Sequence, residues 1–346
     1  MKENIIEQCK EILPTWLSLS VDDFTFDSPK GFSSFTMGVH CKNEVVPRSV
    51  MYRKLQGKDN AILDFNIEKL VFSTLGKSGI AVDFYHYDTN SRIEKFVEGR
   101  SLVVDDLFNS DVLKKIANLL YIFHQHDIPE LPDQIFFELL HDKWGVLSKS
   151  ILEQQSSVFP SNEQEMCLEL QEIYSDATLE KVMRCIPEGE LTLCHNDTYH
   201  GNIMKLNNGE IKLFDFEFSC LNNKCYDFAS LFAESVIKHK QEEYPYFKID
   251  LPEFGDKELG LLINFYLDNC TFESDEERKG EFKKLLQGTK DMLILADYKY
   301  AMAAIPLSLD PIQKIRFIPY AYQRFKKFLK AYDYRFSENI KSGLSL

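Results

Sequence analysis

Tryptophan, paired cysteines and long apolar runs are scarce or missing in this sequence. Only two of the 346 residues are tryptophan, Trp16 and Trp144. The eight cysteines are scattered, with no Cys-x-x-Cys pair and no spacing typical of metal ligands, so we expect reduced thiols in a cytoplasmic protein. No apolar run approaches the ~18 residues that a membrane-spanning helix requires, which predicts that the chain has no membrane span.

Basic residues are also in deficit. The chain has 40 Lys and Arg against 54 Asp and Glu, a formal net charge of -14. This balance disfavours a nucleic-acid partner, which needs a positive surface, and mildly favours a cationic small substrate. The length predicts two domains or lobes, and the composition (44% hydrophobic, 27% charged) is typical of a globular protein.

Strand-like and helix-like patterns are separated along the chain. Five strand-like runs, interrupted by one helix pattern over residues 61–79, precede residue 99. Helix patterns dominate the remainder, except for a hairpin signal at residues 207–209, where Asn-Asn-Gly tolerates positive φ. We therefore predict an α+β, two-lobed fold, with a small β-rich lobe over residues 1–98 and a large, mainly helical lobe over residues 99–346.

The densest polar segment lies just before this hairpin. His195, Asp197 and Asn202 match the pattern H-x-D-x-x-x-x-N, and Asp215 begins an Asp-Phe-Glu sequence where the second hairpin strand ends. The hairpin should return Asp215 to the vicinity of Asp197 and Asn202. Phosphoryl transfer needs a carboxylate to orient the attacking hydroxyl and oxygen ligands to hold Mg²⁺ against nucleotide phosphates. The two motifs together predict a phosphotransferase that uses ATP and Mg²⁺, with Asp197, Asn202 and Asp215 as its catalytic residues.

Such an enzyme places three further requirements on the first lobe: a cation on the third strand, a helix Glu that holds the cation, and a loop of small residues over the phosphates. The third strand offers Arg53 and Lys54, and strand alternation points one inward and the other outward, so the choice stays open from the residues alone. The following helix pattern offers Glu68. The loop candidates are Gly31, Ser33 and Ser34.

These motifs together resemble the choline/ethanolamine kinase family, part of the aminoglycoside-phosphotransferase-like branch of the protein-kinase fold. The resemblance extends from about Cys9 to Tyr334. Its most specific parts are "CHNDTYHGNI", similar to the family's catalytic loop, and "DFEFSCLNNKCYDFASLFAES", similar to its signature. The signature positions are matched by Asp215, Glu217, Asn222, Asp227 and Glu234.

The resemblance implies ATP-dependent phosphorylation of the hydroxyl of choline or ethanolamine, giving phosphocholine or phosphoethanolamine for phospholipid synthesis. Asp197 would orient the hydroxyl and accept its proton, while Asn202 and Asp215 would hold Mg²⁺. The implied ATP contacts are Gly31, Ser33, Ser34, Lys54 with its partner Glu68, and the hinge backbone at Lys95 and Phe96.

The substrate pocket is where this sequence departs from the family. Aromatic faces and carboxylates hold a quaternary ammonium, and the family usually supplies Trp-x-x-Trp on a late helix. The corresponding stretch here, "LADYKYAMAAIPLS", has no tryptophan, so which aromatics line the pocket stays open. The substrate-binding candidates are Asp197, Glu217, Phe218, Glu234, Tyr298 and Tyr300. A primary ammonium has hydrogen-bond donors for carboxylates and trimethylammonium has none, so this pocket favours ethanolamine or another amino alcohol slightly, without excluding choline.

Two other functions stay open from the sequence. One is a kinase of another small alcohol, of the aminoglycoside or thiamine type, and the Asp-Phe-Glu signature argues against it. The other is an inactive nucleotide-binding relative, against which the intact Asp197, Asn202 and Asp215 argue. No Ala-Pro-Glu segment follows Asp215, which disfavours protein substrates. The oligomeric state, a homodimer included, and regulation are not indicated by the sequence.

Overall fold

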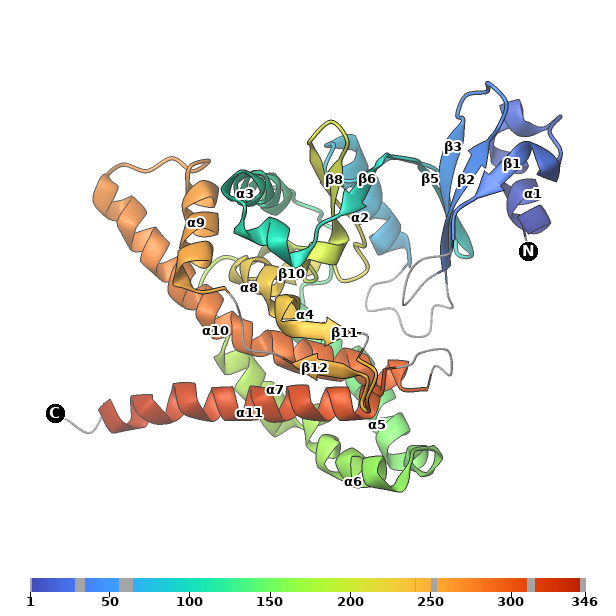
Figure 1. Cartoon of the computed structure of the whole chain (residues 1–346). Coiled ribbons are helices and arrows are strands. Elements are labelled where there is room, and N and C mark those ends of the chain that lie inside the picture. The colour runs from blue at the N-terminus through green and yellow to red at the C-terminus, as the bar shows by residue number, and fades with distance from the viewer. Residues whose placement is uncertain are drawn as a thin grey trace.

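The structure, a computed structural model, has a small lobe built on an antiparallel sheet and a larger, mainly helical lobe (Figure 1). This confirms the predicted fold class. The structure describes residues 2–28, 35–55, 65–239, 241–249, 254–309 and 315–342.

The five predicted strands of the small lobe form one sheet in the order β1-β2-β3-β5-β4. Their bounds are β1 Phe24–Phe26, β2 Phe35–Cys41, β3 Ser49–Lys54, β4 Phe84–Tyr87 and β5 Ser91–Lys95. In β3 the buried Val50 and Tyr52 alternate with Met51 and Arg53, because successive side chains of a strand point to opposite faces. The N-terminal helix α1, Lys2–Ile12, lies against the sheet (Figure 1) and shares its core.

Helix α2, Phe65–Lys77, ties the small lobe to the large one. Its buried Phe72 lies edge-on to Phe216, with ring centroids 5.5 Å apart, and Phe216 in turn stacks on Phe123 of the large lobe. The Asp-Phe-Glu segment is therefore packed between the helix that follows the third strand and the core of the helical lobe.

The chain passes between the lobes after β5. Strand β6, Gly99–Ser101, pairs with β8, Ile203–Leu206, which forms the predicted hairpin with β9, Ile211–Leu213. Gly209 in the hairpin turn has φ +83°, as the Asn-Asn-Gly signal requires. Gly99 is needed for another reason: a Cβ there would lie 2.5 Å from the carbonyl oxygen of Lys205.

Nine α-helices occur in the described part of the large lobe. Their bounds are α3 Ser110–His124, α4 Phe136–Leu140, α5 Val146–Gln154, α6 Ser161–Leu170, α7 Asp176–Arg184, α8 Cys225–Ala233, α9 Asp256–Leu267, α10 Asp275–Leu307 and α11 Phe317–Ser342. Two short antiparallel pairs accompany them: β7 Thr192–Cys194 with β10 Cys220–Asn222, and β11 Ile237–His239 with β12 Phe247–Ile249.

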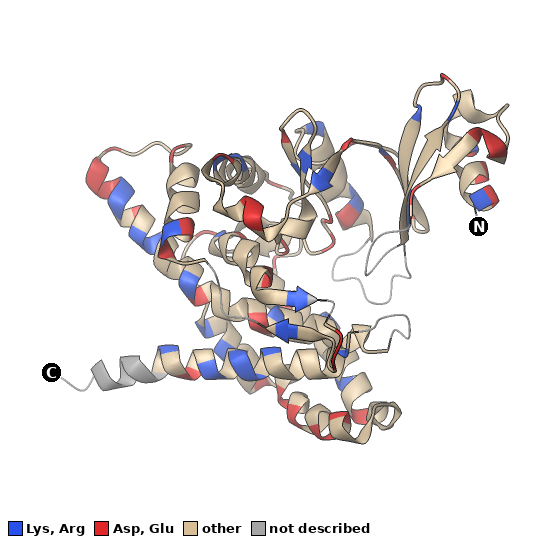
Figure 2. Ribbon diagram, in the orientation of Figure 1, with Lys and Arg blue, Asp and Glu red and all other residues tan. Residues whose placement is uncertain are grey.

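The long helices α10 and α11 pack side by side and cross the large lobe, with α6 below α11 in Figure 1. Acidic and basic residues are mixed along the first half of α10 (Figure 2), as expected of a solvent-facing surface, whereas the charged residues along the described part of α11 are mostly basic. Among the described helices, none combines the length and the apolar character needed to cross a membrane.

Candidate active site

The loop between β7 and β8 carries Asp197, whose carboxylate has hydrogen-bond donors at both oxygens. The Asn202 amide donates to Oδ2 over 2.9 Å. Lys299 Nζ donates to Oδ1 over 2.5 Å, and the Tyr300 hydroxyl donates to the same oxygen over 3.0 Å. The side chain of Asp197 is 13% exposed, so the carboxylate is held in one orientation but remains reachable from solvent.

Asp215 lies beside this loop because the hairpin folds back. The backbone N–H of Phe214 donates to the carbonyl of Asn202 over 2.9 Å, which fixes the end of β9 against the loop. Asp215 has φ +67°, a left-handed conformation that is uncommon outside glycine and that clusters at functional sites. Arg53 of β3 approaches its carboxylate, with Nη1 3.3 Å from Oδ1. Asp197, Asn202 and Asp215 therefore lie together, with a cation of the small lobe facing them.

His195 links the two motifs. Its Nε2 lies 2.8 Å from the carbonyl oxygen of Phe214, so this nitrogen donates. Its Nδ1 accepts the backbone N–H of Asp197 over 3.3 Å. The two contacts are those of an imidazole that donates from Nε2 and accepts at Nδ1, and they hold the loop backbone at Asp197 to the end of the hairpin.

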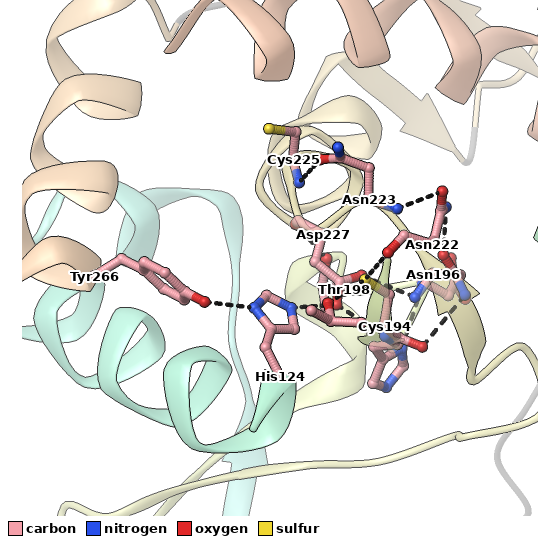
Figure 3. A network of polar contacts seen from close by, with 12 residues as sticks. His124, Cys194, Asn196, Thr198, Asn222, Asn223, Cys225, Asp227 and Tyr266 are labelled. Carbon is pink, nitrogen blue, oxygen red and sulfur yellow. Dashed lines mark hydrogen bonds and ion pairs between the residues drawn. The ribbon is translucent and has the colours of Figure 1, made fainter. Parts of the chain in front are cut away.

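Asp227, at the start of α8, holds the same loop from the other side (Figure 3). Its two carboxylate oxygens accept the backbone N–H groups of His195 and Asn196, each over 2.8 Å. Its carbonyl accepts the Thr198 hydroxyl, and Nε2 of His124 lies 3.1 Å from its Oδ2. Asn196 has φ +61°, a conformation that asparagine tolerates better than most residues, so the network holds the turn that presents Asp197.

The acidic groups of the site form an oxygen-rich cluster. The pKa of Glu217 is raised to about 8, first by burial and then by the negative charges of Asp215, Glu68 and Asp197, while Arg53 acts in the opposite direction. Carboxylates that share a site in this way disfavour each other's ionised form unless a cation joins them. With the amide of Asn202 nearby, the donor set is the kind that Mg²⁺ prefers.

The sequence model of the choline/ethanolamine kinase family matches residues 30–329. The chain belongs to this family. A human choline/ethanolamine kinase is 26% identical over 301 residues, which cover 82% of this chain and 72% of that relative.

Solved structures agree on the fold. A choline kinase from Cryptosporidium parvum Iowa II superposes with a TM-score of 0.74 at 19% identity, covering 100% of this chain and 98% of that one. An ethanolamine kinase from Plasmodium vivax gives 0.73 at 19% identity, covering 95% and 89%. At 19% identity, these superpositions show that the chain shares the fold of the two kinases.

Within this kinase fold, the structure distinguishes Arg53 from Lys54. Arg53 points toward Asp215 and is 13% exposed, whereas Lys54, the next residue of the strand, is exposed. Glu68 accepts the Tyr87 hydroxyl over 2.5 Å and lies 3.6 Å from Nη1 of Arg92, and these described residues include no Glu68–Lys54 ion pair. The expected Lys54–Glu68 pair is therefore replaced by an Arg92–Glu68 pair, because strand alternation turns Lys54 away from the cleft side.

The remaining nucleotide candidates lie along the link between the lobes. Lys95 ends β5, and its backbone N–H donates to the carbonyl of Asp83 over 2.9 Å. The Phe96 ring lies edge-on to His40, with ring centroids 4.7 Å apart. The expected phosphate-loop residues Gly31, Ser33 and Ser34 lie outside the described residues.

The two tyrosines expected in the substrate pocket are separated by the geometry of α10. The Tyr300 hydroxyl reaches Asp197, but Tyr298 is fully buried, packs near Phe137 and Phe328, and has its hydroxyl 3.4 Å from His141. Positions two apart in an α-helix differ by about 200° around the axis, so one faces the site and the other the core.

Two cations near these groups were missed by sequence reasoning. Lys299 lies between Asp197 and the ring of Phe218, 4.8 Å from the ring centroid. The second cation, Arg324, binds Glu234, so this expected substrate carboxylate already has a partner. In the sequence, each of these two residues appears only as a charged residue among apolar helix positions. The same pattern occurs where a charged side chain simply faces solvent, so it did not identify the site.

Proposed function

We propose that this chain transfers the γ-phosphoryl group of ATP to the hydroxyl of a small amino alcohol, choline or ethanolamine. The observation that carries the proposal is the convergence of Asp197, Asn202 and Asp215 opposite Arg53. Membership of the choline/ethanolamine kinase family supports the substrate class. The products would be phosphocholine or phosphoethanolamine, which serve as phospholipid headgroups.

In this mechanism the chain supplies position and charge. Asp197 orients the substrate hydroxyl and accepts its proton, since its carboxylate is fixed by Asn202 yet reachable. Arg53, and not the expected Lys54, contacts the ATP phosphates, because it faces Asp215. The backbone near Lys95 and Phe96 meets the adenine. Little covalent work is required, because phosphoryl transfer is accelerated mainly by positioning and electrostatic stabilisation.

Asp215 and Asn202 would hold Mg²⁺. The gathering of carboxylates supports this assignment, because the charges of Asp215 and Asp197 help to raise the pKa of Glu217 even with Arg53 nearby. When bound there, the ion would supply positive charge that offsets the negative charge developing on the transferred group.

We also propose a boundary between the two lobes and a cytoplasmic location. Residues 1–98 would form the ATP-binding lobe and residues 99–346 the catalytic and substrate-binding lobe. This division is supported by the pairing of β6 with β8 rather than with the small-lobe sheet. All eight cysteines are free, and seven of them are buried, which supports a reducing compartment such as the cytoplasm.

The proposal is tested by ATP turnover with a panel of alcohols. Phosphorylated product and kcat/KM are measured with Mg²⁺ for choline, ethanolamine, thiamine and an aminoglycoside. We expect product with at least one of the two amino alcohols and a kcat/KM well above the values for the other two compounds. Preference for thiamine or the aminoglycoside would replace the proposed substrate class, and ATP binding without any turnover would favour an inactive nucleotide-binding relative.

A further inference from the structure

A lysine side chain lies inside the candidate active site, among groups suited to hold a cation. Lys299 Nζ is 2.5 Å from Oδ1 of Asp197. It lies over two aromatic rings, 4.0 Å from the centroid of Tyr300 and 4.8 Å from that of Phe218. Its side chain is only 2% exposed. One carboxylate and two ring faces are the means by which proteins recognise ammonium ligands, and here they surround an ammonium of the chain itself.

A second internal cation takes up the neighbouring binding groups. The Arg324 guanidinium also lies over Tyr300, 5.2 Å from the ring centroid, and its side chain is 1% exposed. It binds Glu234, and its Nη1 donates to Asp297 over 2.6 Å. The Tyr300 ring and these carboxylates are thus already paired with positive charge, so an incoming ammonium finds few unpaired attractive groups here.

We propose that Lys299 is a specificity-determining residue that competes with the substrate for this cage. The inference rests on the proposed function, because it concerns how an amino alcohol reaches Asp197. The ammonium of choline or ethanolamine stands two carbons from the hydroxyl, so a hydroxyl at Asp197 brings it near Lys299. Two like charges repel at that distance, and the substrate cation binds only when the flexible lysine stem moves its ammonium off the Tyr300 and Phe218 rings.

A matched pair of ligands isolates this effect. Choline and its neutral carbon analogue, 3,3-dimethylbutan-1-ol, have nearly the same shape and differ in the positive charge. In a cage with unpaired rings choline binds more tightly, because the rings attract its charge. With Lys299 in the cage, we expect the full-length wild-type chain to bind choline no more tightly than the neutral analogue, as measured by titration calorimetry.

Removing the internal charge should restore the preference. In Lys299→Met we expect the Kd and KM of choline to fall at least tenfold, which corresponds to about 1.4 kcal/mol, with little change for the neutral analogue. Lys299→Arg retains the charge and should behave as the wild type. Adding Tyr300→Leu to Lys299→Met should abolish the gain, which would locate the bound cation at this ring.

Each outcome bears on the inference. An unchanged or higher choline Kd in Lys299→Met would overturn it, and so would a lower kcat with an unchanged KM, which would assign Lys299 to the phosphoryl-transfer step. If Lys299→Met does not fold, the wild type decides: choline binding tenfold tighter than the neutral analogue refutes the competition. Failure of the wild type to phosphorylate any amino alcohol would refute the proposed function, whereas the calorimetric comparison would still report on Lys299.

Discussion

The carboxylate of Asp227 lies 2.8 Å from the backbone nitrogen of His195, although the two residues are 32 positions apart in the chain. The same carboxylate accepts the N–H of Asn196, and all three residues are fully buried. Buried backbone N–H groups need acceptors, so the first residue of the catalytic loop pattern depends on a side chain from α8. The loop shape that presents Asp197 is therefore set outside the loop.

Asp227→Asn tests this dependence. An amide presents one acceptor and one donor, so at least one of the two loop N–H groups loses its partner. We expect a loss of about 1–3 kcal/mol in the free energy of unfolding, measured by urea denaturation, and a lower kcat because Asp197 shifts. As a control, Asp268→Asn removes an exposed carboxylate that pairs with Arg278 and should change neither quantity noticeably. A kcat and a stability both equal to the wild type would contradict the assignment.

Asp197→Asn tests the role of the carboxylate as proton acceptor. The substitution keeps the side-chain size but removes the negative charge and the basicity. We expect kcat to fall by roughly 10²–10⁴, as for loss of a general base, in steady-state assays with Mg-ATP and the better amino alcohol. ATP affinity, measured by calorimetry, should change little, because Asp197 is assigned to the hydroxyl and not to the nucleotide. Near-normal turnover would refute this role.

The features that sequence reasoning predicted are those encoded by local chemistry. The hairpin at residues 203–213 follows from an Asn-Asn-Gly turn, whose glycine adopts positive φ. Because that turn is short, it fixed the return of Asp215 toward Asn202 without any knowledge of the tertiary fold. The two-lobed architecture followed in the same way from the change in periodicity after residue 98.

The features that were missed depend on long-range packing. Lys299 meets Asp197 across 102 positions, and the face of the 33-residue helix α10 that turns toward the loop is set by its packing on α8 and α11. Buried lysines are rare, and a lysine in a sequence is normally interpreted as a surface residue, so the residue type did not indicate that Lys299 is buried in the site. Strand alternation shows that Arg53 and Lys54 point to opposite faces of the sheet, but it does not show which of them faces the site. That choice depends on the strand register, which the sequence alone does not give.

Arg53 and Lys54 offer a matched pair of variants for the phosphate contact. Arg53→Met should raise the Kd of ATP by 10- to 100-fold, because a charge-assisted hydrogen bond contributes roughly 1.5–3 kcal/mol. Lys54→Met, one position along the strand, should leave the Kd within about twofold, since Lys54 is exposed. Titration of each variant with ATP and Mg²⁺ measures both values. The reverse order would return the role to Lys54.

Arg324 is a buried cation whose removal should destabilise the chain strongly. It is 1% exposed and binds Glu234 and Asp297, so Arg324→Met leaves buried carboxylates with less compensating charge. Breaking such a pair typically lowers the free energy of unfolding by about 3–5 kcal/mol, which urea denaturation can measure.

A matched control lies on the same helix: Arg335→Met removes a half-exposed arginine that makes a comparable pair with Asp291, and the expected loss is under about 1 kcal/mol. If the effect of Arg324→Met arises from unpaired charge, adding Glu234→Gln should recover part of the loss, because the two residues share one interaction. Equal losses for Arg324→Met and Arg335→Met, or additive losses in the double variant, would show that Arg324 stabilises the fold by packing and not by neutralising the carboxylates beside Tyr300.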